Sequence, residues 1–252
     1  MKIYIYIFVI IITIISIYYY TYNKYNLKED GYIIIKNILN QEVCDRIMMT
    51  VNMEMIEKTR EEVFILSSKN RKHLALPIDE NIKYAIGIVC KKIDHIIDKN
   101  FKDPVIAECG IFLSYPGCNN QNWHRDSEKK DDNGNLFTFS FALDDINEVN
   151  GPLQLYNKSH KLPEDKYEML NLKKEDLFNN KHFKKVSATC QRGDLIAWNS
   201  NIIHRGSKNN GNNIRPLFYF SILDNSKIRP KGPTYTLKSK YKGKVNLKEI
   251  IV

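Results

Sequence analysis

The sequence lacks the marks of several protein classes. It has five cysteines and no C-x-x-C pair, which argues against a zinc-binding or redox motif. Because their number is odd and they are scattered, we expect reduced and mostly buried thiols. There is no internal repeat, and no RNA- or DNA-binding motif accompanies the formal net charge of +9, so no nucleic-acid partner is inferred. The cysteines are Cys44, Cys90, Cys109, Cys118 and Cys190.

Charge is missing from one long stretch at the start of the chain. Residues 3–22 are uncharged, rich in isoleucine and end in a tyrosine cluster. A run of this length can span a hydrocarbon core of about 30 Å, and tyrosines are common at membrane interfaces. We therefore predict a single-pass helix that anchors the chain in a membrane, with residues 1–24 as the anchor segment. The pattern does not determine on which side of the membrane the rest of the chain lies. A signal peptide is the less favoured alternative because no small-residue cleavage site follows, and a buried β-rich segment is another.

The remaining residues, 25–252, have the length and composition of one globular domain. Hydrophobic residues make up 43% and charged residues 27% of the chain, which are ordinary values for a globular protein. Apolar residues recur at helical spacing over 41–62, with Asn40 as the N-cap, and over 82–97. From Val105 onward, short strand-like runs alternate with turns. We expect a mainly β fold with flanking helices, a double-stranded β-helix (jelly-roll, cupin-like).

Three residues form a candidate metal site. His124 and Asp126 stand two positions apart, and in an extended segment such side chains point the same way. His204 follows the apolar run 193–198, which is predicted to be a strand. Two imidazoles and one carboxylate occupy one face of an octahedral Fe(II) ion and leave the opposite face for O2 and a co-substrate. The pattern predicts an iron site made by His124, Asp126 and His204.

Arg215 and Thr138 are candidates for binding the co-substrate. Arg215 begins another strand-like run, where a guanidinium could hold the distal carboxylate of 2-oxoglutarate through two hydrogen bonds. Residues 136–142 alternate between phenylalanine and small side chains, so the aromatic face should pack against helices while Thr138 lines a site. Simpler explanations exist: an H-x-D triplet arises by chance, a lone arginine often joins a surface ion pair, and Thr138 can belong to an ordinary half-buried strand. The order of these residues along the chain favours the site.

Short motifs along most of the chain carry a family resemblance. They are Glu29-Asp30-Gly31-Tyr32 at the first strand, Trp123-His124-Arg125-Asp126, Ala142-Leu143-Asp144-Asp145, Asn150-Gly151-Pro152-Leu153, Ser159-His160-Lys161 and Gly193-Asp194-Leu195 followed by His204 and Arg215. Together they resemble the phytanoyl-CoA dioxygenase family, which includes phytanoyl-CoA and ectoine hydroxylases.

The resemblance implies an Fe(II)/2-oxoglutarate-dependent dioxygenase domain over residues 25–252. It implies that His124, Asp126 and His204 bind iron and that Arg215 binds 2-oxoglutarate, with O2 as the other co-substrate and ascorbate as an optional reductant. We expect hydroxylation of an unactivated C–H bond in a small-molecule or lipid-like substrate, with release of succinate and CO2. The alternatives are a membrane-tethered jelly-roll binding module with a non-redox metal site, and an oxygenase that acts on a protein side chain.

Two loops near this site are unusual. Asn157-Lys158 stands where the family has Pro-Gly before the Ser-His-Lys segment, so we expect this loop to turn differently and to affect substrate entry. Residues 161–185 are rich in Lys, Asp, Glu and Asn and form a long connection. Such a connection is either an active-site lid or a solvated surface loop.

Overall fold

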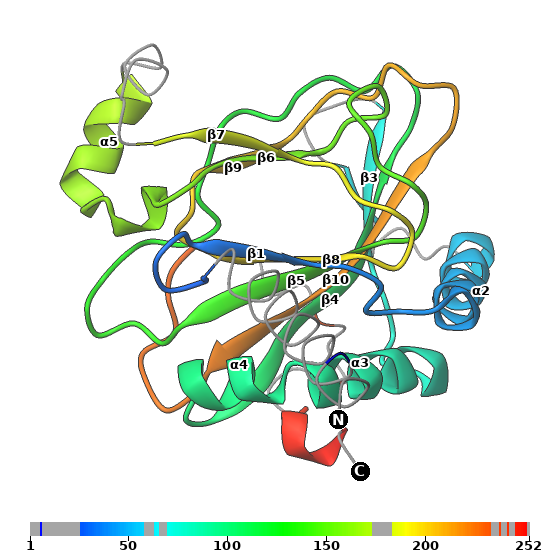
Figure 1. Cartoon of the computed structure of the whole chain (residues 1–252), viewed down its shortest axis with the longest axis horizontal. Coiled ribbons are helices and arrows are strands. Elements are labelled where there is room, and N and C mark those ends of the chain that lie inside the picture. The colour runs from blue at the N-terminus through cyan, green and yellow to red at the C-terminus, as the bar shows by residue number, and fades with distance from the viewer. Residues whose placement is uncertain are drawn as a thin grey trace.

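The protein is built from two antiparallel β-sheets that face each other (Figure 1). A computed structural model describes residue 6 and residues 26–57, 63–65, 70–172, 183–232, 237, 241 and 245–250. The larger sheet has seven strands in the order β1-β8-β5-β10-β4-β3-β2, and the smaller has three in the order β7-β6-β9. The chain passes between the sheets after β5, β7, β8 and β9, which gives the jelly-roll-like arrangement with flanking helices expected from the sequence.

The elements have the following bounds. The large sheet contains β1 (Tyr32–Ile35), β2 (Val63–Ile65), β3 (Arg71–Ala75), β4 (Pro104–Ser114), β5 (Leu136–Ala142), β8 (Leu195–Asn199) and β10 (Arg215–Asp224). The small sheet contains β6 (Leu153–Tyr156), β7 (Lys185–Ala188) and β9 (His204–Gly206). The helices are α2 (Gln41–Glu57), α3 (Glu80–Lys92), α4 (Asp94–Asn100) and α5 (Glu164–Leu172), with short 3-10 turns η1 (Ser159–Lys161) and η3 (Leu247–Glu249).

The alternation in β5 separates a core face from a cavity face. Phe139 and Phe141 are fully buried and belong to the main apolar cluster, which also contains buried residues of α2 and α3. The ring of Phe139 stacks on that of Phe220 in β10, with centroids 5.5 Å apart. Figure 1 places α3 and α4 on the side of the large sheet that faces away from the small sheet. The opposite face of β5, with Thr138, is therefore turned toward the space between the sheets, as predicted.

Helix α2 begins where the sequence predicts, but the helix expected over 82–97 is interrupted. Asn40 caps α2, because its side chain accepts a hydrogen bond of 2.9 Å from the backbone N–H of Val43. The apolar pattern over 82–97 forms two helices instead of one, since Ile93 leaves the helical conformation and ends α3 just before α4 begins. Both helices still bury their apolar faces, so the periodicity is the same across the break. Of the helix expected over 41–62, residues 58–62 lie outside the described part.

The predicted transmembrane helix has to be corrected. Within the part of the chain that the structure describes, no helix combines the length and the apolar character that crossing a membrane requires. Apart from Tyr6, the predicted segment over residues 3–22 lies outside the described residues. The prediction rested on the uncharged, isoleucine-rich length of this segment and on its tyrosine cluster, and such a local composition pattern does not by itself establish a spanning helix. The membrane anchor over residues 1–24 is therefore withdrawn, and with it the membrane as localisation and partner.

The cysteines agree with the expectation of reduced, buried thiols. All five are free and buried. Burial raises the pKa of Cys90 and of Cys190 to about 12, so these thiols stay protonated near neutral pH.

Candidate functional site

His124 and His204 meet although they stand 80 positions apart in the chain. The two residues form an isolated antiparallel bridge in which each backbone N–H donates to the other's carbonyl, at 3.0 and 2.9 Å. The bridge extends β9 of the small sheet with the segment that follows β4. It brings the two imidazole rings to a centroid distance of 4.5 Å.

Asp126 completes the group. Its Oδ1 lies 3.6 Å from Nε2 of His124 and 3.5 Å from Nε2 of His204. One ligand atom from each of the three residues falls within 4.8 Å of the others, a spacing that could hold a metal ion. Oδ2 of Asp126 accepts a hydrogen bond of 3.3 Å from Nε1 of Trp198, which fixes the carboxylate from the side of the large sheet. The predicted trio is thus assembled in the structure.

The orientation of both histidine rings suits metal binding. Nδ1 of His124 lies 2.7 Å from the carbonyl oxygen of Asn122, and Nδ1 of His204 lies 3.0 Å from that of Ile202. A carbonyl only accepts, so each Nδ1 carries a proton, and it is Nε2 of each ring that lies on the side of Asp126. Burial lowers the pKa of His204 below its usual value, although the charge of Asp126 acts in the opposite sense. Neutral imidazole is the form that binds a metal.

The trio lies in the wall of a cavity of about 270 Å³ between the two sheets. Arginine side chains line one part of the cavity and the Glu108 carboxylate lines another. The positions of their partner residues on β10 show how far apart these two parts lie. Arg215 and Ser221 stand six positions apart on β10, which corresponds to roughly 20 Å along the strand. We call the part near Arg215 the arginine end and the part near Ser221 and Glu108 the acceptor end.

Two buried arginines form the arginine end. Arg71 of β3 and Arg215 of β10 are both register partners of Ser114 on β4, so the three side chains lie in one row across the sheet. Arg71 is 1% and Arg215 3% exposed, and neither has a carboxylate within ion-pair distance among the described residues. Burial, and then the charge of Arg71, lower the pKa of Arg215 to about 10. Burying two like charges side by side raises the free energy of the folded protein unless an anion neutralises them.

Backbone carbonyls hold both guanidinium groups without neutralising them. Arg215 donates from Nη1 to the carbonyl of Gly151 and from Nη2 to Oγ of Ser114, the latter at 2.8 Å. Nη2 of Arg71 donates to the carbonyl of Ser207 at 2.8 Å. In both side chains Nε is buried and has no hydrogen-bond partner in the described structure. These unpaired donors indicate that the arginine end is suited to an anionic group.

The metal trio lies between the two ends. Gly206 is two positions beyond His204 on β9, and a Cβ at this glycine would overlap Nη1 of Arg71. Two residues of strand correspond to roughly 7 Å, so the trio is close to the arginine end. On its other side Asp126 bonds Trp198, the register partner of Thr138 at the acceptor end.

The wall next to the arginine end is neutral. His73 of β3 stacks on Phe112 with ring centroids 4.4 Å apart and lies 2.6 Å from the hydroxyl oxygen of Tyr219. Burial lowers the pKa of His73 to about 4, so it is uncharged at neutral pH.

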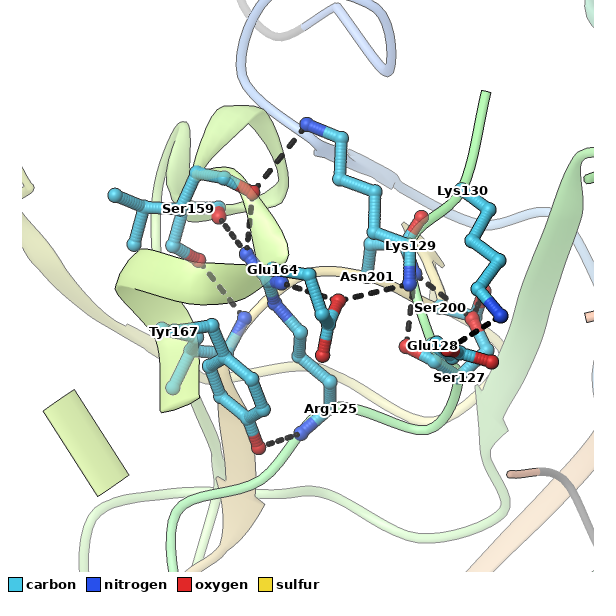
Figure 2. A network of polar contacts seen from close by, with 12 residues as sticks. Arg125, Ser127, Glu128, Lys129, Lys130, Ser159, Glu164, Tyr167, Ser200 and Asn201 are labelled. Carbon is cyan, nitrogen blue, oxygen red and sulfur yellow. Dashed lines mark hydrogen bonds and ion pairs between the residues drawn. The ribbon is translucent and has the colours of Figure 1, made fainter. Parts of the chain in front are cut away.

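Arg125 ties the metal segment to helix α5 (Figure 2). Its guanidinium donates to Oε2 of Glu164 at 3.3 Å and to the carbonyls of Ser159 and Leu162 at 2.9 and 3.0 Å. It also lies over the ring of Tyr167, at 4.3 Å from the centroid. The hydroxyl of Tyr167 in turn accepts from the backbone N–H of Arg125 at 3.2 Å. Because Arg125 separates the two candidate ligands in the sequence, this network holds their backbone in place.

The loop that departs from the family pattern makes a tight turn. Lys158, in the position of the family's glycine, adopts a left-handed conformation with φ of 63°. The turn is supported by Ser159, whose hydroxyl donates to the carbonyl of Tyr156 at 2.7 Å. Residues 161–185 contain α5, while residues 173–182 lie outside the described part, so both a lid and a surface loop stay predictions for this connection.

Sequence comparison identifies the family. The phytanoyl-CoA dioxygenase (PhyH) family model matches residues 27–217, which include all the candidate site residues. The chain belongs to the phytanoyl-CoA dioxygenase family. It is accordingly an Fe(II)/2-oxoglutarate-dependent dioxygenase, with Fe(II) as cofactor and 2-oxoglutarate and O2 as co-substrates, and the donor set of His124, Asp126 and His204 fits such an ion.

Individual relatives agree with the family. A curated relative, dioxygenase trt7 of Aspergillus terreus, is 26% identical over 211 residues, which cover 75% of this chain and 68% of that protein. Among solved structures, the epimerase SnoN with Fe3+, alpha-ketoglutarate and nogalamycin RO has a TM-score of 0.65 at 13% identity, covering 83% of this chain and 86% of that one. HygX from Streptomyces hygroscopicus, with nickel and 2-oxoglutarate bound, has a TM-score of 0.56 at 12% identity, covering 82% of this chain and 85% of that one. At these identities the solved structures show that the fold is shared.

Several residues of the site were not found from the sequence. Arg71, His73 and Glu108 line the cavity, and Arg125 braces it. The alternation of Arg71 and His73 on one face of a strand was the available signal. This signal could not show that β3 pairs with β4, because none of the short motifs in the sequence lies on β3 or β4.

Proposed function

We propose that this dioxygenase hydroxylates a C–H bond of a small-molecule substrate and that His124, Asp126 and His204 hold its metal ion. The observation that carries the proposal is the meeting of two Nε2 atoms and one carboxylate oxygen in the wall of a cavity that also contains two buried arginines. When bound, the iron supplies the activation of O2 and the oxidation of the substrate. The chain's own contribution is to fix its ligands, orient both substrates and exclude water.

For 2-oxoglutarate we propose that Arg215 and Arg71 bind the carboxylate remote from the metal. Both guanidinium groups are buried, both have an unpaired Nε–H, and together they would be neutralised by an anion. The neutral, partly aromatic wall formed by His73 and Phe112 suits the methylene carbons of the molecule. Thr138, the other predicted contact, is buried in the cavity wall, and its binding to 2-oxoglutarate stays a prediction.

We propose that the substrate is a small molecule. We also propose that residues 25–252 form the dioxygenase domain. The cavity of about 270 Å³ must hold 2-oxoglutarate as well, which leaves room for only part of a large substrate. The solved structures of SnoN with nogalamycin RO and of HygX with hygromycin B support a small-molecule substrate.

Isotope labelling tests the proposed reaction. Wild-type protein and Asp126→Ala are incubated under ¹⁸O-labelled O2 with a metabolite extract and analysed by untargeted mass spectrometry. We expect a product that gains labelled oxygen only with the wild type and is unchanged by added chloride or bromide, since the carboxylate of Asp126 leaves no vacant position for a halide. A halogenated product would contradict the assignment of Asp126. Labelled succinate without any product would favour the alternative of a protein side chain as substrate, and no succinate at all would favour a binding module.

Replacing Arg125 by lysine is expected to weaken metal binding about tenfold without unfolding the protein. Lysine keeps the charge but loses the planar fork that reaches Glu164 and two carbonyls at once, so the metal segment loses its support. Losses of about ten- to a hundredfold are usual for groups that orient metal ligands. A competition titration with a metal-binding dye measures the change.

Arg46→Lys is the matched control for this change. Arg46 also pairs with a glutamate, Glu42 at 2.8 Å, and also lies over a tyrosine ring, that of Tyr84, but it does so on the exposed surface of α2. Its replacement should leave metal affinity unaltered. Equal affinities of Arg125→Lys and wild type would show that the network has no part in positioning the ligands.

A further inference from the structure

A second cavity, of about 310 Å³, is lined mainly by lysine and asparagine side chains. The proposed function does not use it. Its lining residues come from segments that are far apart in the chain, and we call it the lysine pocket. The residues with acidic or lysine side chains that line it are Lys28, Lys129, Lys130, Lys161, Lys227 and Asp131.

Two of these lysines are paired with carboxylates. Nζ of Lys130 lies 2.8 Å from Oε1 of Glu128, an ion pair that Figure 2 shows. Nζ of Lys161 lies 2.6 Å from Oε2 of Glu29. The charges of these two lysines are therefore balanced by their partners, and the question is what balances the others.

The other three lysines of the pocket lack such a partner in the described part of the chain. Lys28, Lys129 and Lys227 have no carboxylate within ion-pair distance among the described residues. Asp131, which also lines the pocket, reduces the excess of positive charge but does not remove it. The lysine pocket therefore has a surplus of positive charge, which attracts anions.

Lys129 is the half-buried member of these three. Its Nζ donates to the carbonyl of Leu162 at 3.4 Å, and a carbonyl does not neutralise an ammonium group. Burial, and then the charge of Arg125, lower the pKa of Lys129, although nearby carboxylates act in the opposite sense. An anion in the pocket would stabilise the charged form of this side chain.

The lysine pocket adjoins the acceptor end of the first cavity. On β5, Leu136 lines the lysine pocket and Thr138 lines the first cavity, and two residues of strand correspond to roughly 7 Å. On β8, Asn199 of the lysine pocket follows Trp198, whose Nε1 bonds the carboxylate of the metal trio. The two cavities are therefore neighbours, close enough for groups of one substrate molecule to occupy both.

The donors of the pocket favour a phosphate group over a planar carboxylate. Ammonium groups are point charges with rotatable donors, whereas the guanidinium groups of the arginine end form planar forks that match a carboxylate. A phosphate has oxygens in several directions, so lysines from different segments can each bind one of them. Oδ1 of Asn199 accepts from the backbone N–H of Asn201 at 2.9 Å, which leaves the amide N–H groups of Asn199 as further donors at the pocket.

We propose that the lysine pocket binds a phosphate group, which is held by Lys28, Lys129 and Lys227. The phosphate is either part of the substrate or a separate ion beside the substrate. The pocket goes beyond the proposed function, and only the assignment of the phosphate to the substrate rests on that function. Charge and hydrogen bonds hold the group, and no covalent bond is made or broken in the pocket.

Titration with inorganic phosphate tests the pocket. The protein is saturated with 2-oxoglutarate and carries Zn(II) in place of iron, so that the arginine end and the metal site are occupied, and binding is followed by isothermal titration calorimetry. The wild type should bind phosphate with a Kd below about 10 mM. Added sodium chloride should weaken this binding, because the contacts are between charges.

Two variants connect the binding to these lysines. Lys129→Gln keeps a hydrogen-bond donor but loses the charge, so the affinity for phosphate should fall about tenfold. In the double variant Lys28→Gln/Lys227→Gln the affinity should fall by a factor of about three to ten, because these two side chains are exposed. The control is Lys83→Gln on α3, where Nζ pairs with Glu80 at 3.3 Å away from the pocket, and its affinity should equal that of the wild type.

Treatment of the metabolite extract with a phosphatase distinguishes the two sources of phosphate. The ¹⁸O-labelling assay is run on treated and untreated extract. If the phosphate belongs to the substrate, the labelled product is lost after treatment, whereas the product persists if the phosphate is a separate ion. Absence of labelled product from both extracts contradicts the proposed function and leaves the result of the phosphate titration unaffected.

The titration decides the assignment of the pocket. If the wild type does not bind phosphate within this limit, or if both lysine variants bind it as tightly as the wild type, the assignment is overturned. Folding of each variant is checked by circular dichroism. The double variant, whose two changes lie at the surface, decides if Lys129→Gln does not fold.

Discussion

Replacing His204 by alanine is expected to reduce the turnover of 2-oxoglutarate by at least about a hundredfold. The trio has no ligand to spare, and loss of a direct ligand should cost more than loss of the groups that merely orient ligands, for which about ten- to a hundredfold is typical. Among the described residues, His124, Asp126 and His204 are the group that could hold a metal ion, and His204 is its member from the small sheet. Succinate formation with Fe(II) and O2 is the measurement.

The control for this variant is His95→Ala. His95 lies on α4 with half of its side chain exposed, and it is paired with Asp94 away from the cavity. Its replacement should leave succinate formation at the wild-type level. If His204→Ala retained near-normal succinate formation, the assignment of the metal ligands would be wrong.

Replacing Arg215 by lysine is expected to weaken 2-oxoglutarate binding by a factor of about ten to a hundred. Lysine loses the two parallel hydrogen bonds that a guanidinium makes with a carboxylate. Burial already lowers the pKa of Arg215 to about 10, and a lysine in the same place would deprotonate more easily, because its ordinary pKa is lower. The apparent KM for 2-oxoglutarate should rise, while metal affinity should stay the same.

Arg71 provides the comparison for this effect. Arg71→Lys should weaken 2-oxoglutarate binding in the same direction, since its Nε is also buried and unpaired at the arginine end. The double variant should lose less than the product of the two single losses, because both arginines are proposed to contact one carboxylate. An unchanged KM in Arg215→Lys would assign the carboxylate to another group.

Local patterns in the sequence predicted the elements that carry the site. The alternation in 136–142 predicted β5 and its two faces, and the motif around His124 predicted two ligands on the same side of an extended segment. Asn40 was recognisable as a cap because capping depends on residues a few positions apart. These features depend on short sequence distances, which is why they could be read without a structure.

Features that depend on strand pairing could not be predicted in this way. Arg71 and Arg215 are 144 positions apart (215 minus 71) and become neighbours only because β3 and β10 lie on either side of β4. The alignment of Glu108, Ser221 and Thr138 has the same origin. Register between distant strands is set by the packing of the whole sheet, and no short motif records it.

The membrane prediction was wrong for a different reason. An uncharged, apolar stretch of sufficient length is only a local pattern, and in the described part of the chain no helix is long and apolar enough to cross a membrane. Similarly, periodicity over 82–97 predicted the buried face of the helices but not the break at Ile93, because both helices continue to bury the same side.

The most direct test of the metal site is an anaerobic titration of the wild-type protein with Fe(II) and 2-oxoglutarate, followed by exposure to O2. We predict one Fe(II) per chain, binding of 2-oxoglutarate that depends on the metal, and formation of succinate and CO2 once O2 is admitted. Binding of 2-oxoglutarate that is independent of the metal, or no succinate from protein that holds both, would contradict the account of His124, Asp126 and His204 as the catalytic iron site.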